Sequence, residues 1–254
     1  MTSRGVALVT GAARGIGRTI ARRLADDGYD IAINDPKSSL SELDNVTKEI
    51  GSKGRNVVRI TADITEEVQV KEMIPFVVEK LGGLDVMVAN AGICPLSPLV
   101  ETSSELLDNA MAVNVRGTML CYKYAAKQMI AQGRGGRIVG ASSVAGKRPF
   151  LLGSAYVASK FAVRGLTQVA AMELGKHGIT VNAYAPGFIK TEMLEDVERS
   201  MNMEPGAFVE ASISTLAIPR LGETEDIAEL VSFLVSKKAG YITGQTFSSD
   251  GGWL

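Results

Sequence analysis

The fold of this chain is decided by the stretch Thr10-Gly11-Ala12-Ala13-Arg14-Gly15-Ile16-Gly17. It follows an apolar run that predicts a buried strand over 6–10, and it leads into a helical pattern near 16–27. Glycines allow a tight turn and a close backbone approach to a pyrophosphate, and the helix N-terminus offers free N–H groups to the same anion. The stretch therefore predicts a dinucleotide-binding turn, although its TGxxxGxG spacing differs from the commoner GxGxxG. The alternative is a tight turn with a structural role only.

Short β-rich runs alternate with longer helical patterns up to about residue 185, which is the signature of βαβ units and a parallel sheet. Strands are expected at 6–10, 30–34, 56–60, 84–89, 137–141, 179–184 and 246–249, and helices at 16–27, 41–52, 66–81, 103–131, 154–176 and 225–235. We therefore expect an α/β fold with a Rossmann-type doubly wound parallel sheet, in a single domain over residues 1–254.

The stretch 188–218 breaks this alternation and is too long for a simple connection. It predicts a helical excursion whose apolar side chains form either a mobile lid over a substrate or a small core of their own. The side chains in question are Met193, Leu194, Met201, Met203 and Phe208.

Composition argues against several classes of protein. The 254 residues carry a formal net charge of −1, with 27 basic and 28 acidic residues intermixed, so no basic field for nucleic acid or a membrane is expected. We expect no signal peptide and no membrane-spanning segment. Cys94 and Cys121 show no disulfide or metal-ligand spacing, and His177 is the single histidine. We therefore expect no metal site, no histidine-based triad and a cytoplasmic location.

Polar residues stand at the carboxyl ends of the second, third and fourth predicted strands, where open α/β sheets bind ligands. The carboxylate of Asp35 would accept hydrogen bonds from the adenosine ribose and repel a 2′-phosphate, which favours NAD. Arg14 and Lys37 could instead pair with the phosphate of NADP. Asp63 could contact the adenine and Asn90 could brace the turn, but each is also an ordinary cap or turn residue.

Tyr156 and Lys160 stand four residues apart in a segment that reads as helix, so they share one helix face. A lysine cation beside the phenol should favour the phenolate and lower the pKa of Tyr156 from its usual value near ~10. Tyr156 is therefore a candidate for proton transfer, although such pairs also occur by chance. Asn114 lies inside a long predicted helix, where asparagine is unfavourable, and a local bend that turns it toward the cleft would explain its presence.

In combination, these residues resemble the short-chain dehydrogenase/reductase family over essentially the whole chain. The resemblance rests on the order and spacing of the glycine turn, Asn90-Ala91-Gly92, Asn114, Ser143, Tyr156, Lys160 and Pro186-Gly187. Residues 159–168, 178–182 and 241–245 are most similar to the acetoin (diacetyl) reductase and meso-2,3-butanediol dehydrogenase branch, but other branches share much of them. Val144 departs from that branch, whose members carry a polar residue there, and 147–150 has no match.

The resemblance implies a role for each residue at the centre of the site. Ser143 would bind the substrate oxygen, Tyr156 would transfer the proton, Lys160 would hold the nicotinamide ribose, and Asn114 would support a water-linked proton path. Thr191 would orient the nicotinamide carboxamide. The implied cofactor-binding set is Gly11, Arg14, Gly15, Ile16, Gly17, Asp35, Asp63, Ile64, Asn90, Ala91, Gly92, Tyr156, Lys160, Pro186, Gly187, Ile189 and Thr191.

The expected protein is an NAD-dependent carbonyl reductase or alcohol dehydrogenase, with NADP as the alternative cofactor. Its substrate would be a small secondary alcohol or ketone, such as diacetyl, acetoin or 2,3-butanediol. The alternatives are a polyol dehydrogenase, a 3-oxoacyl-thioester reductase whose carrier is bound by Arg134, Arg137 and Arg148, and a non-catalytic dinucleotide sensor. An apolar tyrosine helix and the resemblance together imply a homodimer or homotetramer.

Overall fold

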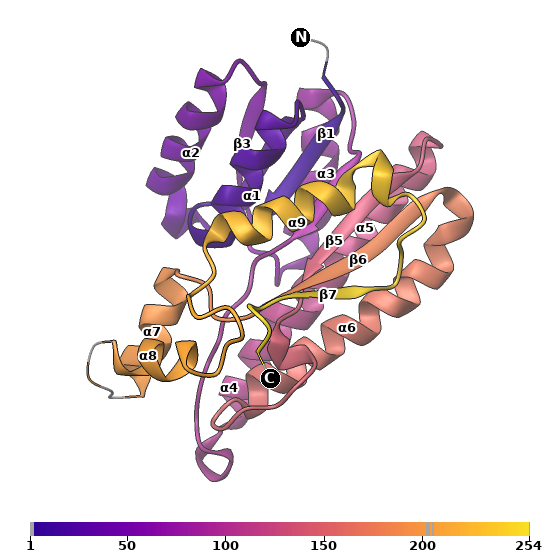
Figure 1. Ribbon diagram of the computed structural model, residues 1–254. Helices are drawn as coiled ribbons and strands as arrows, with labels where there is room; N and C mark the ends of the chain where they lie inside the picture. The colour runs from indigo at the N-terminus through magenta and orange to yellow at the C-terminus, as the bar shows by residue number, and fades with distance from the viewer. Residues whose placement is uncertain (1–2, 202–203, 205, 254) are drawn as a thin grey trace.

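The computed structural model describes residues 3–201, 204 and 206–253, and one seven-stranded parallel sheet lies at its centre (Figure 1). The strands run in the order β3-β2-β1-β4-β5-β6-β7. Their bounds are β1 Val6–Thr10, β2 Asp30–Asp35, β3 Val57–Thr61, β4 Val86–Ala89, β5 Gly136–Ala141, β6 Ile179–Pro186 and β7 Thr246–Ser249. The order reverses between β1 and β4, which makes the crevice at their carboxyl ends the expected ligand site of a doubly wound sheet.

Helices cover both faces of the sheet, as Figure 1 shows. One face carries α1 (Gly15–Asp26), α2 (Leu40–Ser52) and α9 (Thr224–Val235), and the other carries α3 (Glu67–Leu81), α5 (Thr118–Gln132) and α6 (Ser154–Leu174). Successive residues of β1 alternate between the two cores, because side chains of a strand point to opposite faces. Ala7 and Val9 pack under α1, whereas Val6 and Leu8 pack under α3 and α5. The Rossmann-type prediction is confirmed.

One long predicted helix is interrupted. The stretch 103–131 forms α4 (Ser104–Met111), a π-helical segment (Ala112–Gly117) and α5. Asn114 lies in the π-helical segment, is fully buried, and its carbonyl accepts a hydrogen bond of 2.8 Å from the Thr118 hydroxyl. Single π-helical turns inside α-helices are frequent at functional sites. The expected local distortion at Asn114 is therefore present, but the unbroken helix was wrong.

The excursion over 188–218 is helical, as expected, and contains α7 (Glu192–Ser200) and α8 (Ala207–Ile213). Backbone contacts hold its two ends: Ile189 bridges to Gly222, and the Ile218 amide donates to the Gly251 carbonyl at 2.8 Å. No residue of α7 is fully buried, so its apolar side chains make no closed core. Met203 lies outside the described residues.

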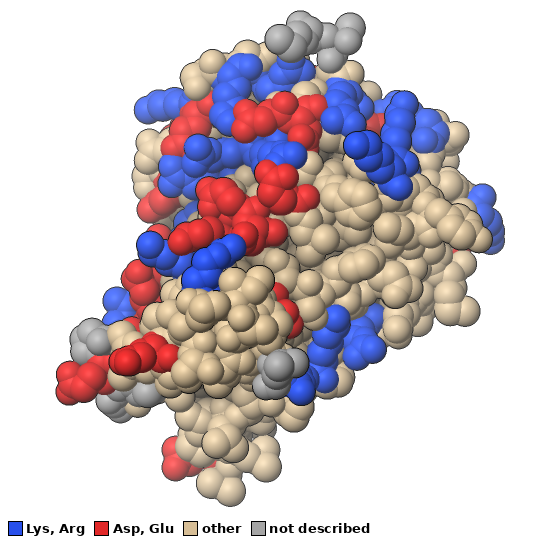
Figure 2. Space-filling view, in the orientation of Figure 1, with Lys and Arg blue, Asp and Glu red and all other residues tan. Residues whose placement is uncertain are grey.

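Charged side chains are distributed unevenly over the surface. Figure 2 shows both signs intermixed over α1, α2 and the start of α9, whereas the surface over β7 is largely uncharged and a group of basic side chains lies over part of α6. The outer face of α6 exposes Phe161, Val169 and Met172. No helix in the described part of the chain is long and apolar enough to cross a membrane.

Leu8→Ala tests the two-sided core. Leu8 is fully buried in the central strand β1, and removing its side chain should lower the free energy of unfolding by about 2–5 kcal/mol. Urea denaturation monitored by circular dichroism measures the change. Val68→Ala on α3 is the control, because Val68 is 65% exposed and should change the stability by less than about 0.5 kcal/mol. A similar loss in both variants would contradict this description of the core.

Candidate active site

The glycine turn packs directly against the loop that follows β4. Gly11 has a φ of +63°, and a Cβ atom there would lie 2.8 Å from the Cα atom of Ala91. The Asn90 side-chain amide donates to the carbonyls of Thr10 and Gly11, both at 3.0 Å. The same side chain accepts a hydrogen bond of 2.7 Å from the hydroxyl of Tyr184, which is fully buried on β6. Asn90 thus connects the ends of three strands at the switch point.

The N-terminus of α1 has the features of a phosphate cradle. Arg14 at the N-cap makes no side-chain capping bond, and the first turn contains no acidic residue. Gly15 has a φ of +53°, and the nearest atom to a Cβ placed there would be the Thr191 methyl group, at 3.6 Å. A Cβ on Gly17 would lie 2.0 Å from the Gly11 carbonyl oxygen, so only glycine allows this approach. With Ile16 between these glycines, the cradle fits the pyrophosphate of a dinucleotide.

The adenosine side of the crevice is set by Asp35 at the end of β2. Its Oδ2 atom accepts a hydrogen bond of 2.9 Å from the Ala13 amide, which ties the carboxylate to the glycine turn. Burial raises the pKa of Asp35, and the Ala13 amide and the Arg14 charge oppose that shift. Arg14 itself forms an ion pair with Glu192 in the first turn of α7. Lys37 is exposed in the 3₁₀ turn that follows.

Asp63 and Ile64 follow β3 at the same edge of the sheet. The Oδ1 atom of Asp63 accepts hydrogen bonds of 2.8 Å from both the amide and the hydroxyl of Thr65, as in an ordinary turn. Ile64 is buried against Gly117, where a Cβ atom would lie 2.6 Å from the isoleucine methyl group. Asp63 therefore has a structural role whether or not it contacts adenine.

The residues expected to carry the chemistry come together at the carboxyl end of β5. The Lys160 ammonium donates to the Ala141 carbonyl at 2.8 Å and lies 5.5 Å from the centre of the Tyr156 ring. Ser143 caps the 3₁₀ turn Val144–Gly146, and its hydroxyl accepts from the Ala145 amide at 3.1 Å. Ser143 and Lys160 are buried, whereas Tyr156 is partly exposed.

Asn114 supports this cluster from the neighbouring helix. Its amide nitrogen donates to the Ile93 carbonyl and to the Ser159 hydroxyl, both at 2.9 Å, and its oxygen accepts from the Ile93 amide at 2.9 Å. A Cβ on Gly92 would lie 3.1 Å from the Asn114 oxygen and 3.3 Å from the Lys160 nitrogen. Asn114 is thus adjacent to Lys160 and fixes the loop beside it.

The expected fall in the pKa of Tyr156 was wrong. Burial raises the pKa of Tyr156 well above its usual value, and hydrogen bonding by Ser143 only partly opposes the shift. Burial also lowers the pKa of Lys160 from 10.5 to about 8. Helical spacing indicates that the two groups are neighbours but contains no information about how much water surrounds them.

Pro186 and Gly187 end β6 and lead across the crevice to α7. A Cβ on Gly187 would lie 2.7 Å from the Asp250 Cα atom, so glycine is required for this packing. Ile189 is buried, and its carbonyl accepts from the Thr191 hydroxyl at 3.2 Å. Thr191 is the N-cap residue of α7 and faces Gly15, which brings the two ends of the expected cofactor site together.

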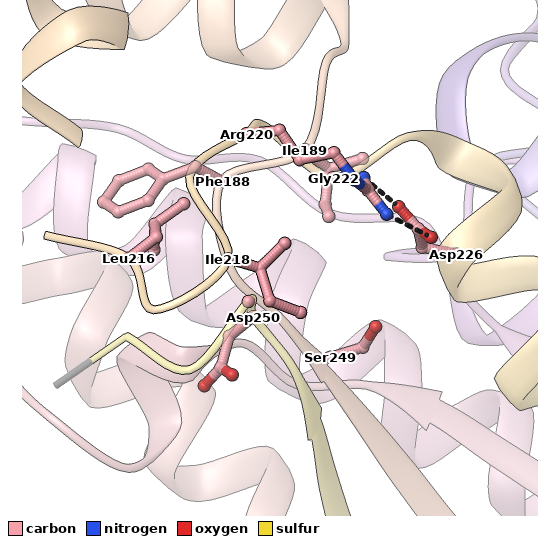
Figure 3. Close-up of a pocket in the computed structure, with 10 residues that line it drawn as sticks. Phe188, Ile189, Leu216, Ile218, Arg220, Gly222, Asp226, Ser249 and Asp250 are labelled. Atoms are coloured by element: carbon pink, nitrogen blue, oxygen red, sulfur yellow. Dashed lines mark hydrogen bonds and ion pairs between the residues drawn. The ribbon is translucent and has the colours of Figure 1, made fainter. Parts of the chain in front are cut away.

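A separate cavity of about 160 Å³ lies at the base of the excursion (Figure 3). Its entrance carries the ion pair of Arg220 with Asp226, whose two contacts are 2.7 and 3.0 Å long. The lining residues are Phe188, Ile189, Leu216, Ile218, Arg220, Gly222, Asp226, Ser249, Asp250 and Gly251. None of the four expected catalytic side chains lines it, so this cavity is not the reaction centre.

Some candidates lie far from the crevice. Arg134 forms an ion pair of 2.7 Å with Asp85, directly before β4. Arg137 of β5 lies opposite Val86, the first residue of β4, in the parallel sheet. Both arginines therefore stand at the amino ends of these strands. The site lies at the carboxyl ends of the strands, on the opposite side of the sheet's length. Arg134 and Arg137 therefore cannot bind a carrier at the site. His177 ends the 3₁₀ turn after α6. Within the described ranges, no three His, Cys, Asp or Glu side chains form a metal-binding group.

Sequence reasoning missed three supporting residues and one ion-pair partner. Thr10 accepts the Asn90 and Ala91 amides at 3.1 and 3.2 Å, Tyr184 holds the Asn90 oxygen, and Ser159 holds Asn114. Thr10 had a weak signal, because it ends the first strand directly before the turn. Glu192 had none, because it is separated from Arg14 by 178 positions.

Comparison with known proteins agrees with this geometry. The family model described as enoyl-(acyl carrier protein) reductase matches residues 11–254. A short-chain dehydrogenase/reductase of Armillaria gallica is 52% identical, over 97% of this chain and 95% of that protein. A diacetyl reductase, (S)-acetoin forming, of Staphylococcus epidermidis is 41% identical over 97% of each chain.

Solved structures of short-chain dehydrogenases also resemble this chain in fold. The crystal structure of a short-chain dehydrogenase from Burkholderia cenocepacia in complex with NADP matches with a TM-score of 0.88 and 40% identity. The match covers 97% of this chain and 96% of that one. With its seven-stranded sheet, its glycine cradle and the cluster at the end of β5, the chain is an enzyme of the short-chain dehydrogenase/reductase family.

Proposed function

We propose that this enzyme interconverts a secondary alcohol and a ketone, with Ser143 and Tyr156 holding the reacting oxygen and NAD(H) as the preferred cofactor. The observation that carries the proposal is the joint position of Tyr156, Lys160 and Ser143 beside Gly92 and the glycine cradle. A non-catalytic sensor would need the cradle but would have no use for this buried cluster. One domain over residues 1–254 would contain both sites.

Each residue at the centre of the site would have its own role in the reaction. Ser143 would donate a hydrogen bond to the substrate oxygen, and Tyr156 would give that oxygen a proton in reduction and remove it in oxidation. The phenol of Tyr156 is protonated at neutral pH and can donate its proton, although burial, which raises its pKa, makes it a weaker acid than a free tyrosine. When bound, the nicotinamide would supply or accept the hydride. Lys160, with Asn114 beside it, would hold the nicotinamide ribose and connect the phenol to a proton path.

Two carboxylates support NAD over NADP. Asp35 would accept hydrogen bonds from the ribose hydroxyls and repel a 2′-phosphate. Glu192 pairs with Arg14 at the turn, and a phosphate would have to compete with this exposed carboxylate for the guanidinium. The Burkholderia relative in complex with NADP keeps NADP as the alternative. Gly11, Gly15, Gly17, Asn90 and Thr191 would serve either cofactor.

Two substrate classes are consistent with the relatives. The Staphylococcus diacetyl reductase supports a small hydroxyketone such as acetoin. A 3-oxoacyl-(acyl-carrier-protein) reductase of Staphylococcus aureus, which is 42% identical over 97% of this chain and 96% of that protein, supports the alternative, a 3-oxoacyl thioester. The placement of Arg134 and Arg137 at the opposite edge weakens the thioester alternative, since only Arg148 of the three expected cations remains near the site.

We also propose a homodimer or homotetramer in the cytoplasm. Phe161, Val169 and Met172 are 42%, 53% and 86% exposed along one face of α6, and a second copy that packs on this face would cover these apolar side chains. The cytoplasmic location is supported by the two free cysteines, Cys94 and Cys121.

Tyr156→Phe should reduce kcat/KM for any ketone by at least about a hundredfold, because the phenol that supplies the proton is removed. Binding of NADH, measured by its fluorescence, should persist. Tyr241→Phe is the matched control, because Tyr241 is fully exposed and far from the crevice. If Tyr156→Phe kept more than a few per cent of the activity, Tyr156 would not be the proton-transfer group.

Lys160→Met should change how stability depends on pH. Below about pH 8 the amine of Lys160 is charged in both the folded and the unfolded chain, so the folded protein bears the full free-energy cost of burying that charge. Between about 8 and 10.5 the unfolded chain binds more protons, so the stability of the native protein relative to the variant rises with pH. The rise should reach roughly 3 kcal/mol in urea denaturation at pH 7–10.5. A flat difference between the native protein and Lys160→Met over this range would contradict the lowered pKa of Lys160.

Asp35→Ser should raise the ratio of kcat/KM with NADPH to that with NADH by at least about tenfold, because the carboxylate no longer repels the 2′-phosphate. Adding Glu192→Gln should raise the ratio further by freeing Arg14. Initial rates with both nucleotides measure the effect, and Asp44→Ser on α2 is the control. An unchanged ratio in the double variant would show that neither carboxylate selects the cofactor.

A further inference from the structure

Four aromatic side chains, which we call the aromatic wall, lie in the segments around the crevice, and one of them, Phe150, stands beside Tyr156. They are Phe150, Phe188, Phe208 and Trp253. The Phe150 ring lies 6.2 Å from the Tyr156 ring, at an interplanar angle of 52°. Phe188 meets Phe208 at 5.8 Å and Trp253 at 5.7 Å, edge to face in both cases. The wall therefore combines the loop before α6, the excursion and the C-terminal segment.

Arg148 joins the two halves of the aromatic wall. Its guanidinium donates to the Trp253 carbonyl at 3.1 Å and lies 5.7 Å from the centre of the indole ring. Lys147, next to it, donates to the Ser248 hydroxyl at 2.8 Å. Both cations of this loop are thus held by β7 and the residues after it.

Phe150 is positioned by backbone contacts. A Cβ on Gly153 would lie 2.7 Å from the Phe150 ring, so the ring packs directly on the glycine backbone. The Ser97 amide donates to the Leu152 carbonyl at 2.8 Å, which pairs this loop with the loop after β4. The ring is still 37% exposed, so one part of it is open to cover by a bound molecule.

The residues around the reacting oxygen offer little hydrogen bonding to a second polar group. Val144 follows Ser143, is 8% exposed, and has no polar side-chain atom. The Asn114 amide is fully used by Ile93 and Ser159, and Lys160 donates to Ala141. A second oxygen next to the reacting carbonyl would lose water and face Val144 or Phe150 without a new partner. An apolar ring in the same place would gain contact with Phe150.

We infer, on the basis of the proposed function, that the site takes ketones and secondary alcohols that carry a ring-shaped apolar group, in preference to vicinal diketones and diols. The apolar ring lies against Phe150, and the carbonyl oxygen lies between Ser143 and Tyr156. Phe150 and Val144 are then the residues that determine specificity. Neither takes part in proton transfer.

The test compares cyclohexyl methyl ketone with acetoin as substrates for reduction by NADH. The native enzyme should prefer the ring-bearing ketone in kcat/KM by at least about tenfold. Phe150→Ala should lower that preference at least about tenfold, Phe150→Leu should lower it less, and Val144→Gln should lower it by giving the acetoin hydroxyl a partner. Phe233→Ala is the matched control, because Phe233 is 43% exposed on α9, away from the wall.

Two kinetic outcomes would overturn the inference. One is a native enzyme that prefers acetoin, and the other is an equal fall with both substrates in Phe150→Ala, which would mean that Phe150 only positions Tyr156. Absence of turnover with either substrate and either nucleotide would refute the proposed function instead. Isothermal titration would then decide the inference alone. Binding of cyclohexyl methyl ketone that exceeds acetoin binding and is lost in Phe150→Ala supports it, and no such difference refutes it.

Discussion

The hydrogen bonds of Asn90 hold together the three strand ends on which the site is built. Its amide reaches the Thr10 and Gly11 carbonyls, and its oxygen receives the Tyr184 hydroxyl from β6. Parallel strands end at one edge of a sheet, but their loops diverge unless something connects them. Because Asn90 fills this place, the glycine cradle after β1 and the cluster after β5 keep a fixed separation. The chemistry of the enzyme depends on that separation.

The π-helical segment Ala112–Gly117 also fixes the position of residues at the site, from the face of the sheet that carries α5 and α6. It places Asn114 where its amide can reach both Ile93 and Ser159, the residue directly before Lys160 on α6. In a regular α-helix, the residues from Asn114 to Thr118 would follow the usual helical spacing, without the π-helical distortion seen here. The substrate contacts that we infer have a different origin, because Val144 and Phe150 lie in the loop between β5 and α6. On that inference, reaction type and substrate preference are encoded by separate parts of the molecule.

Strand positions and most helix ends were predictable, because a buried parallel sheet requires continuous apolar runs and glycine turns between them. Tyr156, Lys160 and Ser143 were found through spacing and family resemblance. The predicted fall in the pKa of Tyr156 was wrong, because the shift depends on burial, which is a property of the assembled site. The ion pair of Arg14 with Glu192 joins positions 178 apart, so no local pattern could show it. Arg134 and Arg137 look like partners for an anion in the sequence, yet they lie at the opposite edge of the sheet.

The contact between the loops after β1 and β4 also has a consequence for how the protein folds. Asn90 and Thr10 are 80 positions apart, and β1 pairs with β4 only after β2, β3 and their helices have been bypassed. Closing such long loops is slow, so we expect this junction to form late on the folding pathway. Under the proposed function, a nucleotide would bind at the same junction and only when the junction is closed. Cellular nucleotide would then stabilise the folded chain relative to the unfolded one by mass action.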